Sequence, residues 1–260
     1  MSTYEVDALL PAWQRDWRLE TAAWCGPRAD APVEMFRFAR EALGISILLP
    51  PCKWGGGFLR QSVRQQCRAL DKAAEAGVQL LLWEPRLIED VDCVAHYPVH
   101  PALAGFVLTD EPHASLFPQL NAARWGLRER RPELLAYVNL PASWTDPSLL
   151  GAASYEEYLD QFAFIVAPDV WSFDDYGTNQ GHDLDDALHT LALVQSRAGA
   201  SPVWAYVSTV AFDDRPVPSF EQKCDWAEAF RSRGASVAWF SYYLPPGGDG
   251  ITWQGAYATY

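Results

Sequence analysis

Residues 105–112, which read GFVLTDEP, join an apolar run directly to two carboxylates and a proline. Apolar residues suited to a buried strand lead into Asp110 and Glu111, and Pro112 stops strand pairing because it lacks an N–H group. Side chains alternate along a strand, so Thr109 and Glu111 are expected on one face and Asp110 on the other. A carboxylate at the carboxyl end of a strand is where α/β barrels place catalytic residues, although it can also cap a following helix.

A second carboxylate, Asp174, follows another short apolar run. The bulky Trp171 and Phe173 suit the layer between a sheet and its helices, which leaves Ser172 and Asp174 on the inward face. We therefore expect Glu111 and Asp174 to face one pocket. Two carboxylates across a cleft are the groups that hydrolyse glycosidic bonds: one protonates the leaving oxygen, and the other attacks the sugar or activates water. Crowding would raise the pKa of the acid, so we predict Glu111 as the acid and Asp174 as the base or nucleophile.

The elements that must position these residues form a regular alternation. Eight short apolar runs lie at residues 19–24, 45–49, 78–83, 105–112, 134–139, 170–173, 202–207 and 237–242. Helical patterns, with apolar residues three and four positions apart, lie at residues 58–76, 116–130, 155–166, 183–197 and 220–233. Strands that alternate with helices pair in parallel through right-handed crossovers, and eight such strands close into a barrel. The sequence therefore predicts an α/β protein with a (β/α)8 TIM-barrel fold.

We expect a single domain, because no stretch rich in Gly, Ser or Pro divides the chain. Residues 19–246 would form the barrel and residues 1–18 a covering segment at the N-terminus. Residues 247–260 would form a C-terminal tail, since no convincing helical pattern follows the eighth strand. The last helix of the barrel is thus predicted to be short or missing.

Residues just past the predicted strands are expected to line one pocket at the carboxyl end of the barrel. The candidate substrate-binding residues are Trp54, Glu84, Asp110, Asn139, Trp144, Asp175, Tyr176, Ser208 and Tyr243. The aromatic members would stack against flat apolar faces such as those of sugar rings, and Asn139 would bond a sugar hydroxyl. Each aromatic residue, taken singly, is equally compatible with packing in the core.

Charge and composition restrict the partners. The formal net charge of −13 argues against nucleic acid, which requires clustered Lys and Arg, and disfavours polyanionic substrates. No run approaches the roughly 18 apolar residues of a membrane span. The N-terminus shows no basic segment followed by a long apolar one, so we expect no signal peptide and a cytoplasmic protein. The oligomeric state is not indicated.

The cysteines and histidines show no metal-binding pattern. The five cysteines are scattered without C-x-x-C spacing, at Cys25, Cys52, Cys67, Cys93 and Cys224. We read them as reduced thiols rather than as disulfides or a zinc site. The five histidines are dispersed, and neither a G-x-G-x-x-G motif nor a Walker loop is present, so we predict neither a metal nor a cofactor.

Several segments together resemble a known family. "HPALAGFVLTDEPHASLFPQL", "LLAYVNLPASW", "LGAASYEEYLDQFAFIVAPDVWSFDDYG" and "VAWFSYYLPP" resemble the barrel glycoside hydrolases of the large clan whose acid/base Glu ends strand four. They look most like its bacterial β-galactosidase- or cellulase-like members, and the match covers about residues 19–253. The resemblance implies an (α/β)8 barrel that processes carbohydrate, with Glu111 as general acid/base.

The chain departs from that clan at two positions. The clan's nucleophile is a Glu at the end of strand seven, where this chain has Ser208 and no carboxylate, and Asp110 stands where the clan usually has Asn. Asp174 is the best replacement for the missing partner, followed by Asp175 and then Glu84.

Two other functions stay open. A degenerate hydrolase would bind carbohydrate without cleaving it, as the missing strand-seven carboxylate suggests. A barrel isomerase or lyase would require a metal cluster or a glycine-rich phosphate loop, for which residues 247–250 are a faint candidate.

Overall fold

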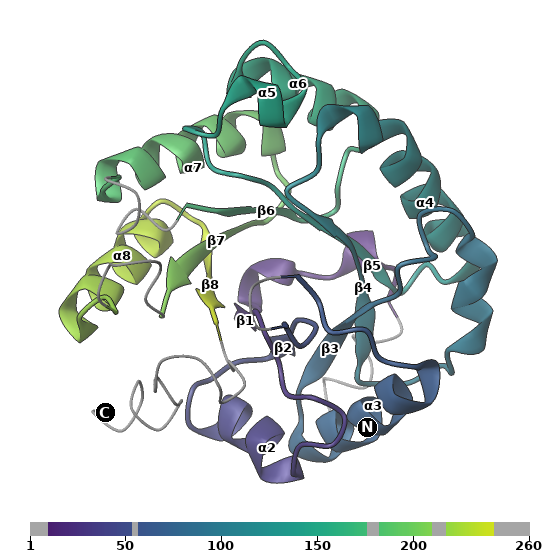
Figure 1. Ribbon diagram of the computed structural model, residues 1–260. Coiled ribbons are helices and arrows are strands. Elements are labelled where there is room, and N and C mark those ends of the chain that lie inside the picture. The colour runs from purple at the N-terminus through teal and green to yellow at the C-terminus, as the bar shows by residue number, and fades with distance from the viewer. Residues whose placement is uncertain (1–9, 54–56, 176–181, 210–216, 242–260) are drawn as a thin grey trace.

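Eight short parallel strands run around a common axis in the computed structural model (Figure 1). They are β1 (Ala22–Ala23), β2 (Ile47–Leu48), β3 (Gln79–Trp83), β4 (Leu103–Asp110), β5 (Leu135–Asn139), β6 (Trp171–Asp174), β7 (Val203–Ser208) and β8 (Ser236–Phe240). Neighbours pair in the order β5-β4-β3-β2-β1-β8-β7-β6. The structure describes residues 10–53, 57–175, 182–209 and 217–241.

The first residue after β5 bridges the two ends of this order. The N–H of Leu140 donates to the carbonyl of Ser172 on β6 at 2.8 Å, and the N–H of Asp174 donates back to the carbonyl of Leu140 at 3.2 Å. With these two bonds the eight strands form a nearly closed barrel with helices between them. The predicted (β/α)8 class is confirmed.

Helices surround the strands (Figure 1). They are α2 (Val33–Glu41), α3 (Val63–Ala76), α4 (Phe117–Arg130), α5 (Pro147–Leu150), α6 (Tyr155–Ile165), α7 (Leu184–Ala198) and α8 (Phe220–Ser232). Four of the five predicted helices agree with the structure to within one residue at each end, but α3 begins at Val63 rather than at residue 58. Sequence analysis missed α2 and α5, and the connection from β3 to β4 contains only a short 3-10 helix, η3 (Val91–His96). No helix among the described residues is long and apolar enough to span a membrane.

Side-chain caps explain where α3 and α6 begin. The Ser62 side chain accepts from the N–H of Gln65, whose side chain accepts from the N–H of Ser62 at 2.9 Å. This capping box starts α3 later than its apolar pattern suggests. Ser154 accepts from the N–H of Glu157 at 3.2 Å, as the sequence pattern predicts for α6. Gly77 ends α3 with φ 72°, a conformation that costs glycine little.

Alternation along the strands divides the buried side chains into two layers. Val107 and Tyr137 belong to the layer inside the barrel. Phe106 and Ala136, one residue before each of them, belong to the layer between strands and helices. Gly105 allows β4 and β5 to approach closely, because a Cβ there would lie 2.6 Å from the backbone nitrogen of Leu135. Adjacent residues on one strand therefore serve different layers.

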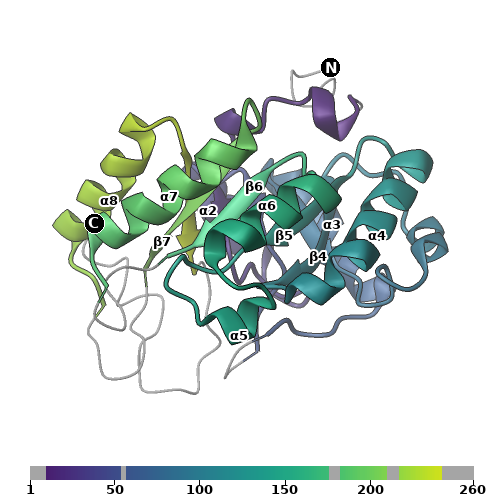
Figure 2. The same ribbon diagram turned by 90° about the horizontal axis from the view of Figure 1, so that it is seen from above.

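A segment before β1 closes the amino-terminal end of the barrel. It contains two 3-10 helices, η1 (Ala12–Gln14) and η2 (Trp17–Leu19). The Trp17 side chain is 1% exposed, and its ring lies 6.4 Å from that of Trp204 inside the barrel. Trp204 Nε1 in turn donates to the Trp17 carbonyl at 3.0 Å. Figure 2 shows this segment on one side of the molecule and α5 on the opposite side, next to the carboxyl ends of the strands.

Candidate functional site

The predicted site residues that the structure describes lie at the carboxyl ends of the strands or in the segments that follow them, as the barrel fold requires. The ones that the structure describes are Glu84, Asp110, Glu111, Asn139, Trp144, Asp174, Asp175 and Ser208. The remaining three, Trp54, Tyr176 and Tyr243, lie outside the described residues.

A β-bulge changes the orientation of side chains at the end of β4. From Val107 to Asp110 the strand advances three residues, whereas its neighbour β5 advances two, from Tyr137 to Asn139. An extra residue of this kind reverses the alternation beyond it. Asp110 thus shares the inward side with Asn139, and the strict alternation that predicted Glu111 inward and Asp110 outward is wrong past the bulge.

Asp110 is the end of a chain of hydrogen bonds across the barrel. Asn139 Nδ2 donates to Asp110 Oδ1 at 3.1 Å, and Ser172 Oγ donates to Asn139 Oδ1 at 2.8 Å. The Tyr137 hydroxyl lies 2.5 Å from Ser172 Oγ and 3.0 Å from the Tyr206 hydroxyl. Asn139, Ser172, Tyr137 and Tyr206 are all fully buried. Four strands, β4 to β7, therefore contribute to one buried polar network inside the barrel.

The electrostatic surroundings of Asp110 favour its protonated form. Neighbouring protein atoms displace water from its carboxyl group and raise its pKa from 3.8 to about 7, although the residue as a whole is exposed to solvent, as Glu111 is. The hydrogen bond from Asn139 opposes this effect, and the negative charge of Glu111 adds to it. Asp110 is consequently a carboxyl group that can hold a proton near neutral pH.

Carboxylates from two strands affect the pKa values of the two phenols in this network, Tyr137 and Tyr206. Burial is the main cause that raises the pKa of Tyr137 and Tyr206 above the usual range. The charges of Asp110 and Asp174 both add to that rise in both tyrosines. Asp110 and Asp174 thus lie near the same pair of buried hydroxyls, one at the end of β4 and the other at the end of β6.

Glu111 follows β4 in an unusual backbone conformation. Its φ is +43°, in the left-handed region that non-glycine residues seldom occupy and that often marks functional positions. Its N–H donates to the carbonyl of Asn139 at 2.9 Å, and the Tyr158 hydroxyl of α6 donates to the carbonyl of Pro112 at 2.7 Å. Glu111 is exposed, and its charge contributes to raising the pKa of Tyr155 and Tyr158. Backbone bonds on both sides hold this residue in place.

Asp174 and Asp175 have different surroundings although they are adjacent. Asp174 ends β6 and is partly buried. Asp175 is fully buried and accepts hydrogen bonds from Trp144 Nε1 at 3.2 Å and from Thr190 Oγ1 at 2.7 Å. Asp175 therefore joins the loop after β5 to α7, which is a structural task.

The same contact fixes the ring of Trp144. This ring stacks on His182 with 4.4 Å between centroids and 8° between planes, and the residue is 38% exposed. His182 Nδ1 lies 3.2 Å from the Asp186 carboxylate. Trp144 is thus an oriented and partly exposed aromatic surface near the carboxyl ends of the strands.

Glu84, at the end of β3, is held in an ion pair. Its two carboxylate oxygens accept from Arg86 Nε at 2.9 Å and Arg86 Nη2 at 2.8 Å, and one of them also accepts from the Tyr97 hydroxyl at 3.0 Å. The hydrogen bonds from Arg86 are the main cause that lowers the pKa of Glu84 from 4.5 to about 2. Glu84 stays ionised and engaged, which suits the structure of the loop rather than proton transfer.

Sequence analysis missed an aromatic cluster at this end of the barrel. The rings of Trp24 and Phe58 stack at 5.1 Å with 12° between planes, and Phe58 lies 5.4 Å from Trp83. Trp24 also lies 5.9 Å from Tyr206 of the polar network. Trp24 and Trp83 both end predicted apolar runs, which is the signal that identifies them in retrospect.

A disulfide joins the segments after β1 and β2. Cys25 and Cys52 are bonded, with 4.8 Å between their Cα atoms. The prediction of reduced thiols is therefore wrong for this pair, because parallel pairing of β1 and β2 brings the two residues together across 27 positions of sequence. Cys67, Cys93 and Cys224 are free thiols.

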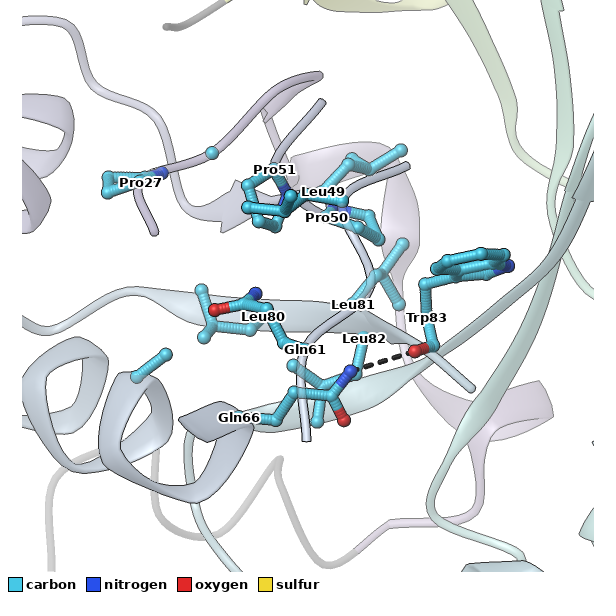
Figure 3. Close-up of a pocket in the computed structure, with 13 residues that line it drawn as sticks. Pro27, Leu49, Pro50, Pro51, Gln61, Gln66, Leu80, Leu81, Leu82 and Trp83 are labelled. Atoms are coloured by element: carbon cyan, nitrogen blue, oxygen red, sulfur yellow. Dashed lines mark hydrogen bonds between the residues drawn. The ribbon is translucent and has the colours of Figure 1, made fainter. Parts of the chain in front are cut away.

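A small cavity lies beside β3, as Figure 3 shows. It is bordered by Pro51, Leu81 and Gln66, whose Nε2 donates to the Trp83 carbonyl at 2.8 Å. Its volume of about 10 Å³ is too small for a sugar, and its lining contains no carboxylate. Within the described part of the chain, no group of three or more His, Cys, Asp or Glu side chains is placed to hold a metal ion.

Comparisons with known proteins show likeness in fold. No family model and no curated protein matches the sequence. A candidate alpha-L-fucosidase from Bacteroides thetaiotaomicron aligns with TM-score 0.62 at 12% identity, covering 92% of this chain and 91% of the other. A beta-galactosidase from the psychrophilic Marinomonas ef1 aligns with TM-score 0.59 at 13% identity, covering 88% of this chain and 54% of the other.

The barrel is also shared by an enzyme of another class. A truncated 3-deoxy-D-arabino-heptulosonate 7-phosphate synthase from Thermotoga maritima aligns with TM-score 0.50 at 12% identity, covering 91% of this chain and 79% of the other. At such identities the likeness establishes the fold, and the chemistry must be argued from the site.

Proposed function

We propose that this protein hydrolyses glycosidic bonds in neutral sugars, using carboxyl groups at the ends of β4 and β6. The observation that carries the proposal is that both strand ends meet the end of β5: Asp110 pairs in register with Asn139, and the N–H of Asp174 donates to the carbonyl of the next residue, Leu140. Carboxyl groups from two strands thus lie close to one point at the carboxyl end of the barrel, where barrel enzymes carry out their chemistry.

Each carboxyl group has a distinct role in the proposed reaction. The Asp110–Glu111 pair on β4 supplies the proton for the leaving oxygen, and Glu111 is the member that sequence analysis favours. Asp174 on β6 acts as base toward water or as nucleophile toward the sugar. Asn139, whose amide bonds both Asp110 and Ser172, is assigned to holding the β4 carboxyl group rather than to binding the sugar.

Two further features support a neutral sugar as substrate. The net charge of −13 disfavours polyanionic ligands, and the oriented ring of Trp144 offers a surface on which a sugar can stack. The fucosidase and beta-galactosidase that share the fold are glycosidases by their names, which agrees with this substrate class.

A panel of chromogenic aryl glycosides tests the proposal. The wild-type protein should release the aryl group from at least one neutral glycoside, and Asp174→Asn should abolish most of that activity. Glu75→Gln is the control, because Glu75 lies on the outside of α3 and pairs with Arg37 there. Activity of the wild type that survives Asp110→Asn, Glu111→Gln and Asp174→Asn would overturn the assignment.

One observation favours a second candidate, a barrel that binds carbohydrate without cleaving it. Strand β7 ends at the buried Ser208, followed by the buried Thr209, and neither provides a carboxylate. This candidate predicts saturable binding of a sugar, measured by calorimetry, with no product after prolonged incubation.

A further inference from the structure

The polar network inside the barrel has a single direction, which follows from counting its protons. Asn139 Nδ2 donates to Asp110, so its Oδ1 must accept, and the single hydroxyl proton of Ser172 is used for that bond. Ser172 can then only accept from the Tyr137 hydroxyl, and Tyr137 can only accept from Tyr206. All four hydrogen bonds of the network are therefore donated in the direction of Asp110.

This direction decides which oxygen of Asp110 carries a proton. Oδ1 faces the amide N–H of Asn139, so a proton on Oδ1 would set two donors against each other. We propose that Asp110, rather than Glu111, is the proton donor of the site, that the proton resides on Oδ2, and that Asn139 and Ser172 are positioning residues that keep it there. The inference rests on the proposed glycosidase function and names the donor within it.

The charged groups around Asp110 agree with this assignment. Glu111 is the charged neighbour whose negative charge raises the pKa of Asp110, so an ionised Glu111 retains the proton on Asp110. Tyr137 and Tyr206 stay neutral because burial raises the pKa of both phenols. Asp174, whose charge also adds to the pKa rise of both phenols, supplies the second carboxylate.

The step balances as ordinary acid-assisted hydrolysis. The Oδ2–H bond of Asp110 breaks as a new O–H bond forms on the glycosidic oxygen, and the electrons of the bond from that oxygen to the sugar carbon leave with the oxygen. Asp110 becomes a carboxylate, which the N–H of Asn139 stabilises at Oδ1. Water supplies the hydroxyl that the sugar gains and the proton that restores Asp110.

The test is the titration of Asp110 itself, monitored by carbon-13 NMR of protein labelled at the Asp carboxyl carbons. The Asp110 signal is assigned as the one that disappears in Asp110→Asn. In the wild type this signal should titrate near neutral pH. Ser172→Ala leaves the Asn139 amide free to rotate away from Asp110. Because the hydrogen bond from Asn139 lowers the pKa of Asp110, that pKa should rise, by about one pH unit at most. Glu111→Gln removes a negative charge, so the pKa of Asp110 should fall.

Opposite signs of these two changes are the distinctive result, because a general loss of structure would not produce them. Ser196→Ala is the matched control: among the described residues the hydroxyl that it removes bonds only members of its own helix, α7, so the titration should be unchanged. With an aryl glycoside that the wild type cleaves, the alkaline limb of the pH–rate profile should move in the same direction as the NMR titration in each variant.

Three outcomes would overturn the inference. The first is a wild-type Asp110 that titrates near pH 4. The second is a fall in the pKa of Asp110 in Ser172→Ala, which would mean that the oxygen and nitrogen of the Asn139 amide are exchanged. The third is the disappearance of the alkaline limb of the pH–rate profile in Glu111→Gln. If the NMR shifts appear as expected but no glycoside is cleaved, the proposed function fails while the placement of the proton on Asp110 is supported.

Discussion

Glu84 and Asp110 hold equivalent places, at the carboxyl ends of adjacent strands, yet their surroundings drive them to opposite charge states. Arg86 and Tyr97 bond Glu84 and lower its pKa to about 2. From the described part of the chain, the Asp110 carboxyl receives one hydrogen bond, from the neutral amide of Asn139, and the displacement of water from this carboxyl raises its pKa to about 7. The strand end alone does not make a carboxylate reactive. The pKa of the carboxyl group depends on whether a cationic side chain pairs with it, as Arg86 does with Glu84.

The largest effect should separate the two carboxyl groups by activity. Asp110→Asn removes the proposed proton donor, so kcat/KM on a cleavable aryl glycoside should fall about 10²–10⁴-fold. Glu84→Gln, assayed where it is folded, should stay within a few-fold of the wild type. The comparison breaks if both variants lose activity to the same extent.

The next effect should separate them by stability. Glu84→Gln replaces a carboxylate that binds Arg86 and Tyr97, so the free energy of unfolding should fall by about 1–3 kcal/mol. Asp110→Asn should not destabilise the fold, because the amide removes a carboxylate that the site disfavours. Urea unfolding followed by circular dichroism measures both, and a larger loss in Asp110→Asn would contradict the contrast.

The pH dependence of stability should then have opposite signs for the two groups. The folded-state pKa of Glu84 lies below its unfolded value of 4.5, so its contribution is present above pH 4.5 and is lost as the pH falls toward about 2. The folded-state pKa of Asp110 lies above its unfolded value of 3.8, so its contribution declines as the pH rises from 3.8 to about 7. The melting temperature of Glu84→Gln should fall less steeply than that of the wild type below pH 4.5. The melting temperature of Asp110→Asn should decline less than that of the wild type as the pH rises from 3.8 to about 7.

The smallest effect concerns a single donor. Tyr97→Phe removes the hydroxyl that lies 3.0 Å from Glu84 Oε2 and 2.6 Å from Gln66 Oε1 but leaves Arg86 in place, so stability should fall by about 0.5–1.5 kcal/mol. The pKa of Glu84 should rise slightly and remain below 4.5. A loss as large as that of Glu84→Gln would show that Tyr97, rather than Arg86, dominates this strand end.

Sequence reasoning identified the eight strands because each is a short apolar run ended by residues that cannot continue it. It missed α2, which has only nine residues and begins after Pro32 without a side-chain cap, so no capping signal marks its start. The helices with strong patterns and caps, such as α6, agree with the prediction to within one residue.

Within the site, Asp174 and Asn139 were identified from strand ends, but the orientation of Asp110 was not. It depends on a bulge in the pairing of β4 with β5, and pairing geometry between two strands leaves no signal in the sequence of one. The hydrogen-bond network of Asp110 also includes Tyr137 and Ser172, and their contact joins two different strands. In the sequence of either strand alone, each looks like an ordinary strand residue. Ser172 was nevertheless placed on the inward face by the bulky residues beside it.

The bond between Cys25 and Cys52 also has a consequence for how the protein is produced. The dithiol and the disulfide are different chemical species, and the cell that makes the chain decides which one is obtained. A cell interior whose glutathione keeps thiols reduced favours the dithiol, whereas an oxidising compartment favours the bonded form. Intact-mass measurements on protein isolated from its natural host would therefore reveal in which of the two environments this molecule matures.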